Sequence, residues 1–231
     1  MLAASFAEAR PFSELAAYAA GLEELGVAGF GWGVAWLDGD GTVRGTKGPG
    51  RFVDEGRHDT DLLARRSTRF LVHLRRPSRL STLDMADTQP FFDGTDSAFC
   101  HNGLLARAEE LRHRYSALLE GRADSEVGWR FFLDERAAGA DTCTALRALD
   151  ETFGGNMNLG VLTSSGELAL YTRNATNRMW HFRLASAALA STDLHSDDDS
   201  LFERVFPVAT DRRLLDPAST VVLAAAEAAA A

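Results

Sequence analysis

The order of the predicted helices and strands constrains the fold of this chain more than any other sequence feature. Apolar residues recur at helical spacing over 125–138 and 142–153, in the middle of the chain, whereas turn-bounded apolar segments dominate both flanks. The segments expected to be strands are 30–37, a short stretch near Val43, 68–75, 98–102, 157–163, 167–173, 180–184, 189–192 and 220–223. This order favours two mainly antiparallel sheets with helical layers over alternating βαβ units.

Two further helices are predicted outside this central pair. Leucine and tyrosine recur at helical spacing over 15–25, and Gly26 is placed to end that helix. An apolar stripe over 104–119 stops at Gly121, which predicts one long amphipathic helix. The connection over 77–94 is a long, Pro-containing loop, and loops of such length often carry function.

Composition and charge narrow the class of partner. The chain has 24 basic and 33 acidic side chains, a net charge of −9, and no run of lysine or arginine. This argues against nucleic acid or an anionic membrane as the main partner. No apolar stretch approaches the ~20 residues that span a bilayer, and no signal peptide is recognisable, so we expect a cytoplasmic protein.

Only two cysteines, Cys100 and Cys143, occur in the chain. Two cysteines cannot make a disulfide framework or a cysteine-based zinc site of the usual kind, and the histidine spacing offers no convincing ligand set. We therefore expect two reduced thiols and no metal.

Four short stretches carry the functional signal. They are Gly31-Trp32-Gly33, the segment from His73 to Ser78, His101-Asn102-Gly103 and Asp124-Ser125-Glu126. In this order and spacing they resemble the class II glutamine amidotransferases, which are N-terminal nucleophile hydrolases, and particularly the compact stand-alone members. The similarity covers roughly the first 130 residues, with a looser match in the later hairpins. The resemblance implies a single domain over 1–231 with an α+β fold, a four-layer α/β/β/α sandwich.

The resemblance also implies a role for each site residue. Glutamine is a zwitterion, and Arg75 is expected to bind its carboxylate bidentately while Asp124 binds its ammonium group. Ser78 adds a hydrogen bond. Asn102 and the backbone N–H of Gly103 would donate to the oxygen that becomes negative when the amide carbon turns tetrahedral. This chemistry needs no metal or organic cofactor.

Each residue also has a plainer interpretation. Arg75 can be an ordinary surface charge, and Asp124 can be a helix N-cap. Asn102 and Gly103 both tolerate positive φ, so the pair can be a simple turn. His73 and His101 are more simply structural residues than catalytic ones, because neither has an acidic residue nearby in the sequence.

The sequence departs from the family at the nucleophile and in one loop. The family uses a cysteine at the first position of the mature chain, whose α-amine is the base, and Met1 has no thiol. Cys100 cannot form a dyad with His101, because neighbours on a strand point to opposite faces. Relatives usually have His where Gln89 stands before Pro90-Phe91.

Three hypotheses therefore remain open. In the first, the natural chain begins about two residues before Met1 with a cysteine, and the protein releases ammonia from glutamine or a γ-glutamyl compound, passing it to a synthase subunit. In the second, it is an inactive member that binds such a ligand. In the third, it is a structural or regulatory subunit. Whether the protein is an enzyme stays open at this point.

Overall fold

The computed structural model describes residues 1–231 except 27, 78–81, 186, 195–198 and 225–231. The strands are β1 (Leu2–Pro11), β2 (Trp32–Leu37), β3 (Val43–Gly48), β4 (Arg66–Leu74), β5 (Phe91–Phe92), β6 (Ser97–Leu105), β7 (Gly155–Thr163), β8 (Leu168–Thr172), β9 (Met179–Leu184), β10 (Ala187–Thr192), β11 (Thr210–Leu214) and β12 (Ser219–Val222). The helices are α1 (Ser13–Leu25), η1 (Gly56–His58), α2 (Thr60–Ala64), η3 (Met85–Asp87), α3 (Ala108–Leu111), η4 (Arg112–Tyr115), α4 (Asp124–Ala137), α5 (Thr142–Phe153) and α6 (Asp199–Val205).

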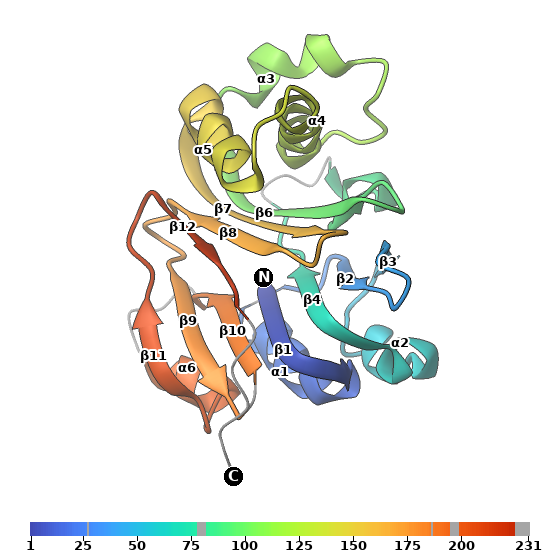
Figure 1. The fold of residues 1–231 in the computed structure, drawn as a ribbon, viewed down its shortest axis with the longest axis vertical. Coiled ribbons are helices and arrows are strands. Elements are labelled where there is room, and N and C mark those ends of the chain that lie inside the picture. Colours follow the sequence, from blue (N-terminus) through green and yellow to red (C-terminus); the bar gives the residue numbers. More distant parts are fainter. Residues whose placement is uncertain (27, 78–81, 186, 195–198, 225–231) are drawn as a thin grey trace.

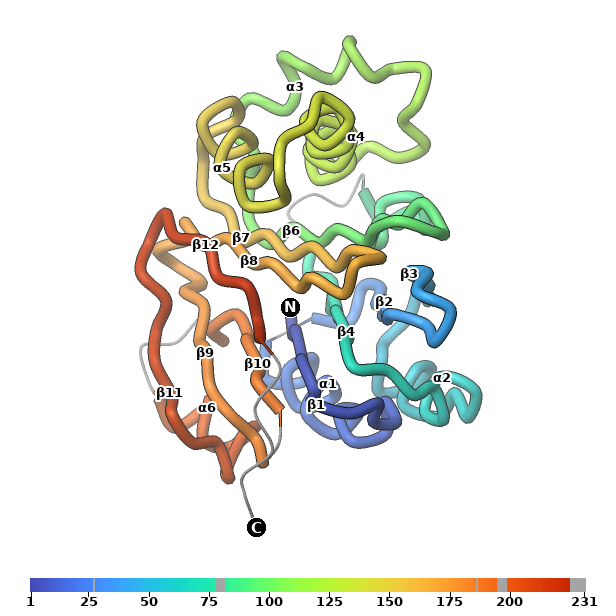
Figure 2. Tube along the Cα trace, in the orientation of Figure 1, coloured from blue at the N-terminus to red at the C-terminus, as the bar shows by residue number. Residues whose placement is uncertain are grey.

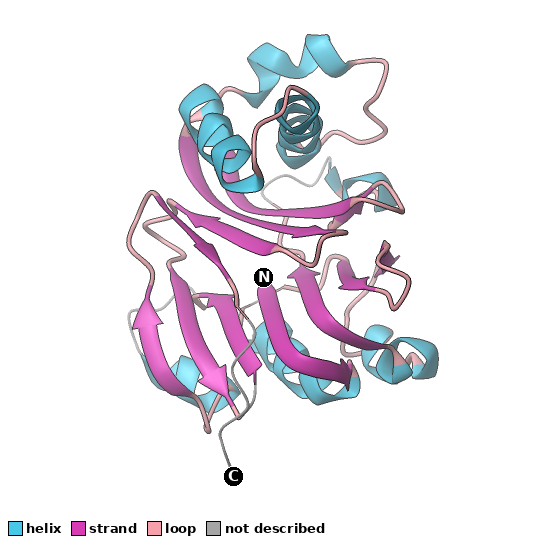
Figure 3. Cartoon of the chain, viewed as in Figure 1, coloured by secondary structure: helices cyan, strands magenta, loops and turns pink. Residues whose placement is uncertain are grey.

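Two antiparallel sheets are stacked between helical layers (Figure 1). The larger sheet has the order β11-β9-β10-β1-β4-β2-β3, and the smaller has the order β12-β8-β7-β6-β5. Helices α1, α2 and α6 cover the outer face of the larger sheet, and α4 and α5 cover that of the smaller one (Figure 3). None of the helices in the described ranges is long and apolar enough to cross a bilayer. The predicted α/β/β/α sandwich is confirmed.

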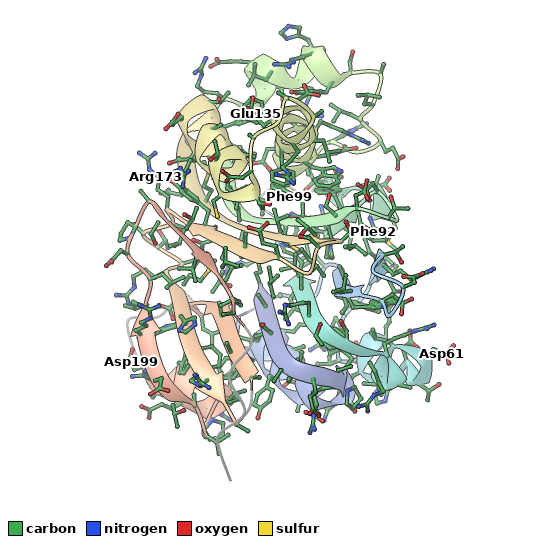
Figure 4. All side chains as sticks on the ribbon, viewed as in Figure 1. Asp61, Phe92, Phe99, Glu135, Arg173 and Asp199 are labelled. Atoms are coloured by element: carbon green, nitrogen blue, oxygen red, sulfur yellow. The ribbon has the colours of Figure 1, made fainter. Side chains whose placement is uncertain are left out.

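Alternating side chains divide each central strand between two apolar cores. On β4, Phe70 and Val72 pack against the α1 layer, whereas Leu71 packs between the sheets. On β6, Phe99 (labelled in Figure 4) packs against Trp129 of α4, with ring centroids 5.7 Å apart, whereas Cys100 packs between the sheets. Cys100 and its neighbour His101 therefore point to opposite faces, as the alternation predicts.

Helix α5 shows how local sequence sets an element of this frame. The Asp141 side chain accepts a hydrogen bond of 2.8 Å from the backbone N–H of Thr144 and so caps the helix. Leu146 and Leu149 recur on its buried face, and Gly154, with φ of 57°, ends it. The prediction of a helix over 142–153 is confirmed.

Strand β1 was not predicted from the sequence, yet it lies at the centre of the larger sheet. It pairs with β10 on one side and β4 on the other, with Leu2 opposite both Ser191 and Val72. Its run of small residues has low intrinsic strand preference, so the neighbouring strands decide its conformation. Figure 2 shows that this arrangement places the N-terminus beside the smaller sheet, in the interior of the sandwich.

The prediction of one long helix over 104–119 is wrong. Strand β6 continues to Leu105, where it still pairs with Gly155 of β7, and only short helices at 108–111 and 112–115 follow. Leu104 and Leu118 are exposed. The apolar spacing was helical, but pairing with β7 satisfied the backbone of the first residues and overrode their helix propensity.

Candidate functional site

A cavity of about 520 Å³ opens where β4 and β6 end, and its volume is typical of small-molecule sites. Four predicted site residues line it: Arg75, Asn102, Gly103 and Asp124. They come from the end of β4, from β6 and from the first residue of α4. The fifth, Ser78, lies outside the described residues.

Arg75 is held by the backbone of the segment before β2. Its N–H donates to the carbonyl of Gly31 over 2.8 Å, and its carbonyl accepts from the N–H of Phe30 over 3.2 Å. Its Nη1 donates to the carbonyl of Asp84 over 3.1 Å. The residue is only 5% exposed, so it is not an ordinary surface charge. Burial lowers the pKa of its guanidinium, while the nearby Asp87 carboxylate opposes that shift.

Asn102 and Gly103 lie on the ladder between β6 and β7 rather than in a simple turn. Gly103 has φ of 134°, and a Cβ there would collide with the backbone carbonyl of Asn156. Only glycine therefore fits without moving β7. The Oδ1 of Asn102 lies 3.5 Å from the Nδ2 of Asn177, which donates to it.

Asp124 anchors the start of α4 to the end of β6. Its Oδ2 accepts from the N–H of Leu105 over 2.8 Å, and its Oδ1 accepts from the N–H of Ser125 over 2.8 Å. Its backbone is already helical, and the preceding residue, Ala123, is the N-cap. The hydroxyl of Ser125 in turn hydrogen-bonds Nδ1 of His101 over 2.8 Å. This orienting partner of His101 is far away in sequence, so no local pattern predicted it.

Four buried polar atoms without a hydrogen-bond partner among the described residues belong to residues that line this cavity. They are His73 Nδ1, Asp87 Oδ2, His101 Nε2 and Asn177 Oδ1. Buried polar atoms are normally paired, so this concentration points to a polar ligand. Sequence analysis did not single out Asp87 or Asn177, because neither belongs to a motif of its own.

Both signs of charge line the cavity. The basic residues are Arg75, Arg76, Arg112 and Arg122, and the acidic ones are Asp87, Glu109 and Asp124. Opposite charges around one cavity suit a zwitterion better than a simple anion or cation. Gln89 takes part through its Oε1, which accepts from the backbone N–H of His101 over 2.5 Å and so ties the preceding loop to β6.

Neither thiol is placed as a nucleophile. Cys100 is fully buried between the sheets, and burial raises its pKa far above the ordinary value. Cys143 lies on α5, where burial also raises the pKa of its thiol. Both thiols are thus less ionised than an ordinary cysteine. Over the ranges that the structure describes, no group of three or more His, Cys, Asp or Glu could hold a metal ion.

The start of β1 lies beside His73, a residue that lines this cavity. The α-amine of Met1 donates to Oγ1 of Thr192 over 2.9 Å, and burial lowers the pKa of that amine to about 6. Its charge also helps to lower the pKa of His73, a residue of the cavity wall. Because Leu2 lies opposite Val72, Met1 is in register with His73, one step from the end of β4.

We expect the folded protein to lose stability in mild acid. Burial lowers the pKa of His73 well below its ordinary value and also lowers the pKa of His101. The unfolded chain binds protons at these groups near pH 6.5, where the folded protein binds fewer. The buried α-amine of Met1, whose ordinary pKa is 8.0, acts in the same direction. The free energy of unfolding should therefore be highest above about pH 8 and should fall as the pH drops through 8 and then through 6.5.

Urea unfolding at pH 8, 6.5 and 5 measures this dependence. His113 is exposed, so His113→Gln should keep the wild-type profile, whereas His73→Gln should make the decrease between pH 8 and pH 5 smaller. Equal free energies of unfolding at all three pH values would contradict the expectation.

Comparison with known proteins shows what the chain resembles. The family model for class II glutamine amidotransferases matches residues 2–215. The glutamine phosphoribosylpyrophosphate (PRPP) amidotransferase from B. subtilis has a TM-score of 0.73 at 16% sequence identity, over 96% of this chain and 46% of that one. The chain thus spans about half the length of that protein. A search of the curated proteins finds no match.

Two solved structures match this chain over nearly their full length. A glutamine aminotransferase class-II domain protein from Silicibacter pomeroyi has a TM-score of 0.59 at 15% identity, over 96% of this chain and 99% of that one. A predicted glutamine amidotransferase from Pseudomonas aeruginosa has a TM-score of 0.53 at 16% identity, over 100% and 99%. At such identities the structures show a shared fold, the N-terminal nucleophile hydrolase fold. Since the family model covers most of the sequence, the chain belongs to the class II glutamine amidotransferases.

Proposed function

We propose that the protein hydrolyses the side-chain amide of L-glutamine, giving glutamate and ammonia. The observation that carries this proposal is the convergence of Arg75, Asn102, Gly103 and Asp124 on one cavity. These residues come from three separate segments of the sequence, and each has the chemistry that one part of glutamine requires. The family to which the chain belongs supports the same substrate.

The zwitterionic end of glutamine is bound by Arg75 and Asp124. Arg75 uses Nη1 for the Asp84 carbonyl and the Thr88 hydroxyl. Its other N–H groups have no hydrogen-bond partner among the described residues, so they can bind the substrate carboxylate. Asp124 accepts one backbone N–H at each oxygen and keeps further lone pairs for the ammonium group. Two fixed charges then place the amide carbon at the far end of the substrate, which is catalysis by positioning.

The nucleophile in this proposal is a cysteine two residues before Met1. A strand advances about 3.3 Å per residue, and β1 begins beside the end of β4, to which it is antiparallel. With Leu2 opposite Val72, a residue two positions before Met1 comes opposite Arg75. A cysteine there would carry its own α-amine into the cavity.

The reaction then balances without a cofactor. The α-amine accepts the thiol proton, and the thiolate sulfur attacks the amide carbon, forming the S–C bond. Asn102 Nδ2 and the Gly103 N–H stabilise the resulting oxyanion. The C–N bond breaks, and the leaving nitrogen takes the proton from the α-amine of the cysteine. Ammonia departs, and the γ-glutamyl group remains bound to the cysteine sulfur as a thioester. Water hydrolyses this thioester to glutamate and restores the thiol. We propose that the ammonia passes to a partner, a synthase subunit that accepts it. The alternative substrate is another γ-glutamyl amide.

Calorimetry on the chain beginning at Met1 tests whether the protein binds glutamine, because binding by Arg75 and Asp124 does not need the nucleophile. L-glutamine should bind with one site per chain. Glutaramate, which lacks the ammonium group, and 4-aminobutanamide, which lacks the carboxylate, should each bind at least 30-fold more weakly, about 2 kcal/mol. A flat titration of folded protein with L-glutamine would overturn the proposed function.

A further inference from the structure

Asn177 lies in the turn between β8 and β9, and hydrogen bonds hold both its backbone N–H and its backbone carbonyl. Asn174 Oδ1 accepts from the N–H groups of Thr176 and Asn177 over 3.1 and 3.0 Å. The Asn177 carbonyl accepts from Nδ2 of Asn158, whose own Oδ1 accepts from the hydroxyl of Thr172 over 2.8 Å. This network fixes the Asn177 backbone against β7 and β8.

The side chain of Asn177 lies beside Asn102 at the cavity. Its Nδ2 donates to Oδ1 of Asn102 over a long 3.5 Å, while its own Oδ1 is buried without a partner in the described part of the chain. Asn177 lines the cavity and is 8% exposed. The contact orients the two amides as a pair, because reversing either one would place like ends together. Nδ2 of Asn102 and Oδ1 of Asn177 are the two ends that this contact does not use: one donor and one acceptor.

A primary amide is the complement of that pair. Its oxygen accepts and its –NH2 group donates, from the same carbon. We propose that Asn177 is a specificity-determining residue whose Oδ1 accepts a hydrogen bond from the –NH2 group of the substrate amide, while Asn102 and Gly103 donate to the amide oxygen. This inference rests on the proposed function and names the substrate class more narrowly: primary γ-amides, in preference to γ-carboxylates and γ-esters.

The preference for amides follows from the free-energy cost of leaving the buried Oδ1 of Asn177 without a hydrogen-bond donor. With glutamate in the cavity, Oδ1 of Asn177 would face a carboxylate oxygen instead of an N–H group, so two acceptors would meet. Sites built to pair with a donor reject analogues that lack it, because the polar atom stays desolvated and unpaired. The same contact would favour release of the product glutamate once the amide is gone.

Calorimetry with L-glutamine and L-glutamate at pH 7.5 tests this assignment on the chain beginning at Met1. The wild-type protein should bind glutamine at least tenfold more tightly than glutamate. In Asn177→Leu, and in the smaller Asn177→Ala should the first variant not fold, this ratio should fall to within twofold of one. The matched control, Thr176→Leu at an exposed position of the same turn, should keep the wild-type ratio.

The outcomes separate this inference from the proposed function. A purely structural Asn177 would weaken both ligands equally and keep the ratio, which would overturn the inference alone. Equal binding of both ligands by the wild-type protein would do the same. Absence of glutamine binding to the folded wild-type protein would overturn the proposed function and the inference together.

Discussion

A chain that carries Cys-Ala directly before Met1 should release ammonia from L-glutamine, at least a thousandfold faster than the chain beginning at Met1. In the chain that begins at Met1, the described residues include no ionised thiol at the cavity, since burial raises the pKa values of Cys100 and Cys143. The added cysteine would bring a thiol and an α-amine opposite Arg75. Nucleophile and oxyanion donors would then act on one carbonyl, and removing a nucleophile from such a site typically costs several orders of magnitude.

The measurement is ammonia release in a coupled assay, after removal of the initiating methionine has been verified by mass spectrometry. The matched control carries Ala-Ala in place of Cys-Ala and should stay at the rate of the chain beginning at Met1. Trapping the γ-glutamyl thioester by mass spectrometry identifies the attacking residue. A folded Cys-Ala chain that binds glutamine and releases no ammonia would contradict the proposed position of the nucleophile.

Replacing Arg75 by methionine should weaken L-glutamine binding at least 100-fold, about 3 kcal/mol. The side chain is 5% exposed and faces the cavity, so the substrate carboxylate would enter a buried site with no cation to pair with it. Arg75→Lys should keep the charge but lose bidentate geometry, and should recover only part of the affinity.

Calorimetry measures the affinity, and thermal unfolding verifies that each variant is folded. Arg57 provides the matched control, because it is exposed and does not line the cavity, so Arg57→Met should bind glutamine as the wild-type protein does. Wild-type affinity in a folded Arg75→Met protein would show that the carboxylate binds elsewhere.

The sequence predicted the fold well where local signals agree with the final structure. The apolar face and capping residue of α5 lie within one short segment, so its limits could be predicted closely. The helix expected over 104–119 failed for the opposite reason. The first residues of that expected helix belong to β6, which pairs with residues of β7 about fifty positions later in the sequence. Hydrophobic periodicity is read within a short stretch of sequence, so it cannot detect a pairing partner that far away.

The candidate site divides in the same way. Arg75, Asn102, Gly103 and Asp124 were chosen because their motifs resemble those of a family, and the structure brings all four to one cavity. Asn177 belongs to no such motif, and its place in the site follows from contacts with residues on β6 and β7. The spacing of residues along the sequence does not predict those contacts.

By itself, the sequence determined the class of architecture, the family and the chemical types available for binding, because these depend on residue order and side-chain identity. Only the tertiary structure decided that β1 is a central strand whose start lies beside a cavity residue. It also decided that one cavity is lined by His73, Asp87, His101 and Asn177, each with a buried polar atom that has no partner among the described residues. The reason is that pairing between distant strands and burial of polar atoms are relations between segments that the chain brings together only on folding.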